Sequence, residues 1–306
     1  MKDDSKLTVV IPAYNAEKYI GETLESIVRQ ITNFDFSILV SDDCSTDTTH
    51  EICMAYKARF PNLSVVKQVK NLGMAANQHF VITQPNTKYI AYLDSDDIFA
   101  CDNYLQLQFD FLETHETCAL VFSNVEIFGK GQPSRIRFMD AVKPPMIFNL
   151  HAYLDQVIPI CNSAMVFRSK FNSQIPLLFK NYFQYDWLLH IYHGLNGNFG
   201  YNDFVGVRYR VHSNNATSTR NTEKIALDAI ELVYKMQELL PVEYHQYFTH
   251  PRYEMNRLAL FYLTERKWLS FVHWYRKWIE VADFEKVNWR DQFYLFRQAL
   301  FHKKLG

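Results

Sequence analysis

The chain has 306 residues, of which 48% are hydrophobic and 21% charged, and its formal net charge at pH 7 is −1. This composition supports a sizeable folded core and excludes an intrinsically disordered chain. The near-neutral charge gives no reason to expect a nucleic-acid partner, and no apolar run approaches the about 20 residues that span a membrane.

The first 125 residues alternate between predicted strands and predicted helices. Short apolar runs predict strands at residues 7–11, 36–40, 63–66, 89–93 and 119–122, and helical periodicity predicts helices over 19–31, 48–60 and 74–82. Thr48 and Glu51 have the spacing of a capping box at the start of the second helix. Continuous apolar strands separated by helices predict an α/β fold, with a mostly parallel twisted sheet that is flanked by helices.

Polar clusters follow three of these strands, at residues 12–15, 41–45 and 94–97. In open α/β sheets, ligands bind beyond the carboxyl ends of the strands, so we expect the clusters to form one site. A nucleotide fits such a site, because Asp43 can accept hydrogen bonds from a base or a ribose while Asp96 holds a metal that binds the diphosphate.

The run of Asp94, Asp96 and Asp97 places three carboxylates within one turn. Such neighbours raise each other's pKa unless a cation neutralises them. Ligands that are all oxygen suit Mg²⁺ or Mn²⁺. The alternative is a solvated acidic turn or helix cap after a strand.

The second half of the chain is less regular. Residues 129–145, which include Arg135 and Arg137, show no periodicity and predict a mobile loop near the donor site. Residues 163–168 suggest a further strand, and Arg168 at its end is either part of that strand or simply a surface charge. The five cysteines, Cys44, Cys53, Cys101, Cys118 and Cys161, show no zinc spacing and indicate reduced thiols in a cytoplasmic protein.

After residue 218 the pattern becomes helical, aromatic and basic. Trp268, Trp274, Trp278 and Trp289 are interleaved with Lys and Arg residues. Such a region either contacts an anionic membrane surface peripherally, or packs on the rest of the chain or on a second subunit in a homodimer.

Four runs resemble the glycosyltransferase family 2 pattern on the GT-A fold: VVIPAYNAEKYIGETLESIVRQ, LVSDDCSTDTT, NLGMAANQ and YIAYLDSDD. The resemblance implies an inverting, metal-dependent transferase that moves a sugar from a nucleotide-diphosphate sugar, expected to be a UDP-sugar. Its acceptor would be a hydroxyl of a saccharide or of an undecaprenyl-diphosphate-linked lipid, in the synthesis of a bacterial surface polysaccharide such as lipopolysaccharide or capsule.

The resemblance also implies roles for individual residues. Asp96 is the expected direct ligand of Mn²⁺ or Mg²⁺, and His212 a further metal or phosphate contact, although a lone histidine is more often structural. Arg210, in a Tyr-Arg-x-His ending, is expected to stabilise the departing diphosphate. The expected nucleotide-binding residues are Pro12, Tyr14, Asn15, Asp43, Asn71, Gly73, Asp94, Ser95 and Arg210. The run at 71–77 lacks the arginine that many family members carry there.

An acceptor hydroxyl needs a base, because an alcohol is a poor nucleophile. Asp186 begins a helical stretch and matches the family's Glu-Asp-Trp/Tyr motif, with Tyr185 in place of the usual acidic residue. Asp186 is therefore either the catalytic base or a helix N-cap. Trp187 either stacks on an acceptor sugar or fills the core.

These patterns predict a GT-A catalytic domain over residues 1–218 and a helical region over 219–306. Within the first, residues 1–100 form the nucleotide-sugar-binding half and 101–218 the acceptor half. A nucleotidyltransferase would need a Gly-rich phosphate loop near the first strand, and a DxDxT phosphatase would need Thr where Ile98 stands. An inactive family member that acts as a scaffold is the non-enzyme alternative.

Overall fold

The computed structural model describes residues 5–129, 132–137, 146–156, 158–212, 222–248, 255, 259, 263 and 265–281. The chain forms two compact units, Met1–Ser213 and Asn214–Gly306. Trp289 and the predicted loop residues 138–145 lie outside the described residues.

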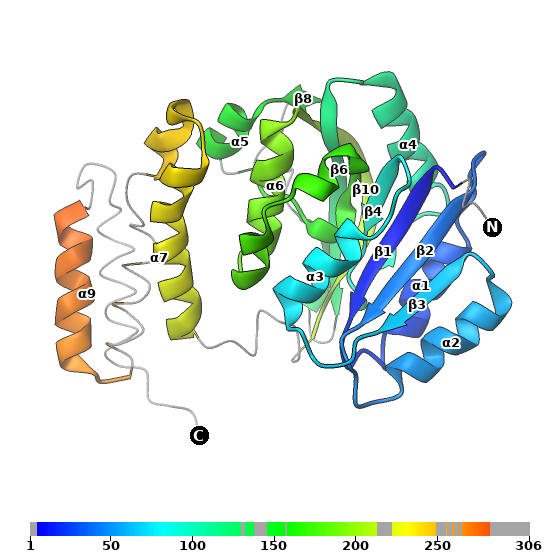
Figure 1. Ribbon diagram of the computed structural model, residues 1–306, viewed down its shortest axis with the longest axis horizontal. Helices are drawn as coiled ribbons and strands as arrows, with labels where there is room; N and C mark the ends of the chain where they lie inside the picture. Colours follow the sequence, from blue (N-terminus) through cyan, green and yellow to red (C-terminus); the bar gives the residue numbers. More distant parts are fainter. Residues whose placement is uncertain are drawn as a thin grey trace. The chain divides into compact units, whose positions relative to one another are not determined.

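The first unit is built on one sheet with the strand order β3-β2-β1-β4-β9-β6-β10-β5, with β7 paired to β6 and β8 to β10 (Figure 1). The first four strands, β1 to β4, run parallel, as do β6 and β10, whereas β9 runs antiparallel to both β4 and β6. The strands are β1 (Leu7–Ala13), β2 (Phe36–Asp42), β3 (Leu63–Lys67), β4 (Tyr89–Tyr92), β5 (Ile98–Phe99), β6 (Cys118–Gly129), β7 (Gln132–Arg137), β8 (Ile147–Phe148), β9 (Met165–Arg168) and β10 (Asn198–Val211).

Helices cover both faces of this sheet because its strands are apolar on both sides. Leu7, Val9 and Ile11 pack in one core with Leu24 of α1 and Leu105 of α4, while α3 contacts β1 from the other face. The helices of this unit are α1 (Ile20–Val28), α2 (Thr49–Arg59), α3 (Met74–Thr83), α4 (Tyr104–Thr114), α5 (Leu150–Gln156) and α6 (Tyr185–Leu195). The prediction of an α/β fold with a flanked, mostly parallel sheet is confirmed.

Two local predictions were wrong, and one open alternative is decided. The capping box is absent, because Thr48 gives α2 no side-chain cap and Asp47 Oδ1 instead accepts a hydrogen bond from Thr49 N–H (3.0 Å). Residues 132–137 are not loop but strand β7, paired with β6. Arg168 is not a surface charge, since its buried guanidinium donates to Tyr89 Oη (3.0 Å) and to backbone carbonyls of neighbouring elements.

The second unit contains α7 (Thr222–Leu239), the 3-10 helix η4 (Val242–Phe248) and α9 (Trp268–Val281). It has its own apolar cluster, in which Phe271 and Trp278 of α9 are buried with Ala226 and Ile230 of α7. None of the helices in the described part of the chain has the length and hydropathy of a membrane span.

Candidate active site

The polar clusters after β1, β2 and β4 lie at the carboxyl edge of the sheet, as expected for parallel strands. Asp43 N–H donates to Ala13 O (2.8 Å), and Asn15 N–H donates to Ser45 Oγ (2.9 Å), which ties the first two clusters together. The Asn15 side chain accepts from Thr46 N–H (2.9 Å). These contacts fix residues 12–15 beside residues 42–46 and leave Tyr14 half-exposed at the edge.

Asp43 organises the start of α3. Its buried carboxylate accepts from Leu72 N–H at Oδ1 (2.6 Å) and from Gly73 N–H at Oδ2 (3.0 Å). Asn71 Nδ2 donates to the Asp43 carbonyl (3.2 Å), and Gly73 has φ +86°, a conformation that glycine adopts without strain. The structure thus brings together Asp43, Asn71 and Gly73, and both carboxylate oxygens of Asp43 already accept backbone hydrogen bonds.

Asp94 is the first carboxylate of the acidic turn that follows β4. Tyr92 Oη donates to its Oδ1 (2.8 Å), and Ser163 Oγ lies 3.3 Å from its Oδ2. Burial, then the negative charge of Asp96 and that of Asp186, raise the pKa of Asp94 to about 7. A carboxylate held in this way has a strong preference for a nearby cation.

Asp97 plays a different part in the same turn. Its side chain is fully buried, and both oxygens are engaged, with Arg210 N–H donating to Oδ1 (2.8 Å) and Ser163 Oγ to Oδ2 (2.5 Å). Burial and the charges of Asp96 and Asp94 raise the pKa of Asp97 well above its usual range. Asp97 therefore holds the turn against β10 and is not available to a ligand.

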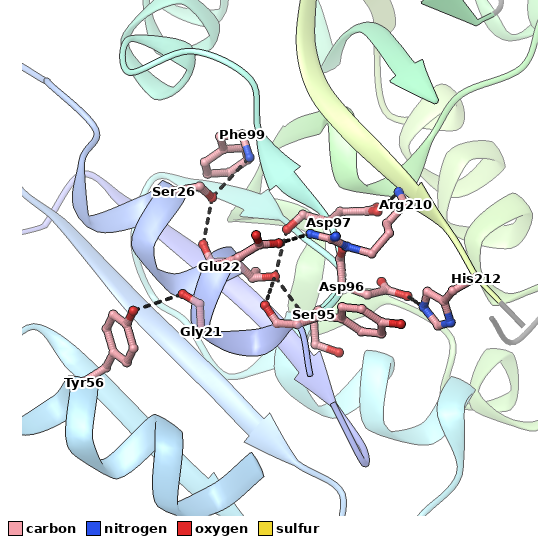
Figure 2. A network of polar contacts seen from close by, with 12 residues as sticks. Gly21, Glu22, Ser26, Tyr56, Ser95, Asp96, Asp97, Phe99, Arg210 and His212 are labelled. Carbon is pink, nitrogen blue, oxygen red and sulfur yellow. Dashed lines mark hydrogen bonds and ion pairs between the residues drawn. The ribbon is translucent and has the colours of Figure 1, made fainter. Parts of the chain in front are cut away.

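Asp96 faces the end of β10, where His212 Nε2 lies 2.9 Å from Asp96 Oδ2 (Figure 2). Arg210 Nε donates to the Asp96 carbonyl (2.9 Å), and its guanidinium also pairs with Glu22 of α1. Tyr19 stacks on the His212 ring with 4.6 Å between ring centroids. The predicted residues Asp96, Arg210 and His212 are therefore neighbours although 114 and 116 residues separate the two β10 residues from Asp96.

The residues present fit a divalent cation. Asp94 and Asp96 offer carboxylate oxygens, the donors that Mg²⁺ and Mn²⁺ prefer, and His212 offers an imidazole nitrogen. The crowded negative charge that raises the Asp94 pKa is what a cation would neutralise. Within the described residues, no three acidic, histidine or cysteine side chains already stand close enough to ligate one ion.

Asp186 lies in the first turn of α6, next to the acidic turn. Its exposed carboxylate accepts from the N–H of Trp187 at Oδ1 (2.8 Å), and no side chain caps the helix at Gln184. The charge of Asp186 raises the pKa of Asp94 and of Tyr92, which places it within electrostatic reach of the carboxylates. Trp187 is partly exposed beside it.

Several residues that hold the site had no sequence signal. Thr23 Oγ1 of α1 lies 2.8 Å from the Asp97 carbonyl and 3.0 Å from that of Ser95. Glu22, also of α1, pairs with Arg210 (Figure 2). Ser163 contacts both Asp94 and Asp97 from 69 and 66 residues away. Ser163 is the first residue of the run 163–168 that predicted a strand, and the pattern there gave no sign of a contact with the acidic turn.

The model of the family described as glycosyl transferase family 2 matches residues 8–175. An uncharacterised protein of Mycobacterium bovis is 27% identical over 228 residues, which are 71% of this chain and 62% of that protein, so the match spans less than two thirds of the relative. The poly(ribitol-phosphate) beta-N-acetylglucosaminyltransferase TarS of Staphylococcus aureus is 32% identical over 130 residues, covering 42% of this chain and 22% of TarS.

Solved structures share the fold. TarS 1–349 in complex with UDP-GlcNAc has a TM-score of 0.61 and 20% identity, covering 96% of this chain and 81% of the TarS chain. A mannosyltransferase from Pyrobaculum calidifontis, solved with GDP-Man and Mn²⁺, has a TM-score of 0.56 and 14% identity, covering 98% of this chain and 86% of that one.

Proposed function

The chain belongs to glycosyl transferase family 2, and from this premise we propose that it is a metal-dependent, inverting glycosyltransferase. It moves a sugar from a nucleotide-diphosphate sugar to an acceptor hydroxyl. One observation carries the proposal: Asp96 lies against His212 at the carboxyl edge of the sheet, and Asp94 in the same turn is within electrostatic reach of Asp96 and of the exposed carboxylate of Asp186.

The nucleotide-sugar donor is expected at the edge formed by the ends of β1, β2 and β4. Half-exposed Tyr14 is positioned to stack on a base, beside Pro12 and Asn15. Asp43 contributes by holding Asn71 and Gly73 in the loop that borders this edge. A UDP-sugar is the proposed donor, supported by the fold likeness to TarS in its UDP-GlcNAc complex.

Asp94, Asp96 and His212 are the residues that would hold Mn²⁺ or Mg²⁺. Such an ion supplies positive charge for the diphosphate leaving group. Ser95 presents its backbone in the same turn, which Thr23 anchors from α1. Arg210 adds positive charge beside the turn, although its guanidinium is already engaged by the Asp96 carbonyl and by Glu22.

Asp186 is the proposed catalytic base, which takes the proton of the acceptor hydroxyl as that oxygen attacks the anomeric carbon. A single in-line displacement inverts the configuration at that carbon. The exposed oxygen of Asp186 and the partly exposed Trp187 mark the acceptor side of the site. A saccharide or an undecaprenyl-diphosphate-linked lipid is the proposed acceptor.

We place this activity in the synthesis of a bacterial surface polysaccharide, supported by the similarity to TarS. Residues 1–218 would form the catalytic domain, and 219–306 a helical region that contacts the cytoplasmic face of the membrane peripherally. Exposed apolar residues of α9 lie among basic residues. This combination favours contact with an anionic membrane surface over burial of the same face in a homodimer.

A thermal-shift screen of UDP-sugars and GDP-sugars with and without Mn²⁺ tests the proposal. A donor at 100 times its Kd should stabilise the wild type by about 2.7 kcal/mol in the presence of Mn²⁺. Asp96→Ala should lose this metal-dependent stabilisation, whereas Asp35→Ala, at an exposed position before β2, should keep it. Unchanged Mn²⁺-dependent donor binding by Asp96→Ala would show that the metal-site assignment is wrong.

A further inference from the structure

One short segment contacts both the acidic turn and the helix that carries the proposed base. The 3-10 helix η1 (Asn162–Ala164) precedes β9 and contains two adjacent side chains that point to different parts of the site. Ser163 contacts the acidic turn after β4, whereas Asn162 contacts His190 of α6, the helix whose first turn carries Asp186.

Ser163 joins the carboxylates of Asp94 and Asp97. Its Oγ accepts from Asp94 N–H (3.1 Å), donates to Asp97 Oδ2 (2.5 Å) and lies 3.3 Å from Asp94 Oδ2. The residue is fully buried, so no water competes for these contacts. The position of η1 therefore sets the position of the acidic turn.

His190 makes the matching contacts on the other side. Its Nε2 lies 2.9 Å from Asn162 Oδ1, and its Nδ1 lies 3.1 Å from Tyr153 Oη. An amide oxygen only accepts hydrogen bonds, so Nε2 carries the proton and Nδ1 accepts from the tyrosine hydroxyl. Burial lowers the pKa of His190 to about 3, which keeps the ring uncharged at neutral pH, while the two hydrogen bonds select the tautomer.

We propose that the pair Asn162–His190 is a positioning device that fixes the proposed base Asp186 relative to the metal-binding carboxylates. Asp186 and His190 are four residues apart on one helix and so lie on the same face. The His190–Asn162 hydrogen bond holds α6 against η1, and Ser163 of η1 holds the acidic turn. The position of Asp186 relative to the acidic turn therefore depends on both contacts. This inference rests on the proposed function, because it assigns a geometric role within that reaction.

The chain supplies a matched control for the test. His193 lies one turn further along α6, is as buried as His190, and has no hydrogen-bond partner for either ring nitrogen within the described part of the chain. His190→Phe removes a buried imidazole and two hydrogen bonds, whereas His193→Phe removes only the imidazole. Any difference in rate or stability between the two variants therefore reports the effect of losing the two hydrogen bonds.

The measurements are kcat for UDP release with a saccharide acceptor, Kd for the UDP-sugar in Mn²⁺, and melting temperature. A displacement of about 1 Å in a reacting group costs on the order of 10²-fold in rate, so kcat of His190→Phe should fall by about that factor with donor Kd unchanged. His193→Phe should keep the wild-type kcat. His190→Gln places a donor at the Nε2 position and should recover most of the rate, whereas His190→Asn, which can reach only Tyr153, should not.

The outcomes separate the two proposals. If the wild type binds no nucleotide sugar and transfers no sugar, the proposed function fails. If the wild type is active but folded His190→Phe keeps the kcat of His193→Phe, or if Gln and Asn at position 190 behave alike, the positioning role is wrong while the proposed function stands.

Discussion

Asp94, Asp96 and Asp97 carry the same side chain within four residues, and their surroundings give them three different properties. Asp97 has both oxygens occupied, by Arg210 N–H and Ser163 Oγ, and acts as an anchor. Asp94 is partly buried and has a raised pKa. Asp96 keeps its carboxylate at the edge of the site, next to His212. Residue type alone predicts a cation site, but only the contacts tell ligands from anchors.

Replacing Asp186 by Asn separates the two interpretations of that residue. Asn keeps the shape but takes no proton at neutral pH, so transfer should fall by about 10² to 10⁴-fold while donor Kd hardly changes. If Asp186 only supports the helix start through Trp187 N–H, melting temperature should fall and turnover per folded molecule should persist. Near-normal turnover by folded Asp186→Asn would contradict the catalytic assignment.

Asp43→Asn tests whether the carboxylate shapes the nucleotide-binding edge. The variant replaces one acceptor oxygen by an amide that faces a backbone N–H of Leu72 or Gly73, which leaves a donor unpaired and costs about 1–3 kcal/mol of stability. The distorted loop should weaken UDP binding even without metal, as calorimetry would measure. Asp35→Asn, which is exposed, should change neither quantity.

At the scale of elements, the sequence pattern predicts those strands and helices whose formation depends on neighbouring residues along the chain. The strands and the first three helices follow from apolar periodicity, because burying these side chains determines both the elements and their faces. The ends are decided by long-range contacts: α1 ends at Val28, and Gln30 beyond it donates to the Cys101 carbonyl (2.7 Å) and accepts from Leu105 N–H (3.0 Å). The anchors Thr23 and Ser163 were unpredictable for the same reason, since no local pattern marks a contact that the sheet order creates.

The buried histidines of α6 give the protein a specific acid sensitivity. Burial lowers the pKa of His190 and His193 to about 3, below the ordinary value of 6.5. Between these two pH values the unfolded state therefore binds more protons than the folded state. Each histidine's contribution to the free energy of unfolding is complete above about pH 6.5, and it falls by at most about 1.4 kcal/mol per pH unit as the pH decreases. Asp94, whose pKa is raised, has the opposite effect over about pH 7 to 4.

His193→Phe isolates one of these contributions. Urea denaturation of the metal-free protein should show the variant gaining stability relative to the wild type as pH falls from 7 to 4.5, because the variant has lost one group that protonates on unfolding. The Asp94 effect cancels in this comparison, since both proteins retain it. A constant difference in stability across this pH range would mean that His193 is not held neutral in the folded state.

At the scale of the whole molecule, the chain combines a site-bearing α/β unit with a helical unit that has its own core. Helical spacing of apolar residues predicted helices in the C-terminal region, and the structure separates its aromatic residues: Phe271 and Trp278 are buried, whereas Trp268 is exposed. A family 2 transferase that acts on lipid-linked acceptors needs to reach a membrane surface. The second unit is the proposed means of doing so.

The exposed surface of α9 makes that contact testable. Leu269 is 90% and Val272 58% exposed, next to the basic residues Lys267 and Arg276. The protein should cosediment with anionic vesicles at low salt and be released at high salt, because charges are screened beyond about 10 Å at 0.1 M.

Leu269→Glu should abolish sedimentation by adding a repelled charge to the apolar contact, without affecting folding since the side chain is exposed. Leu177→Glu, at a 63% exposed position in the first unit, should sediment like the wild type. Absence of binding to anionic vesicles at low salt would leave packing within the chain or a second subunit as the role of this helix.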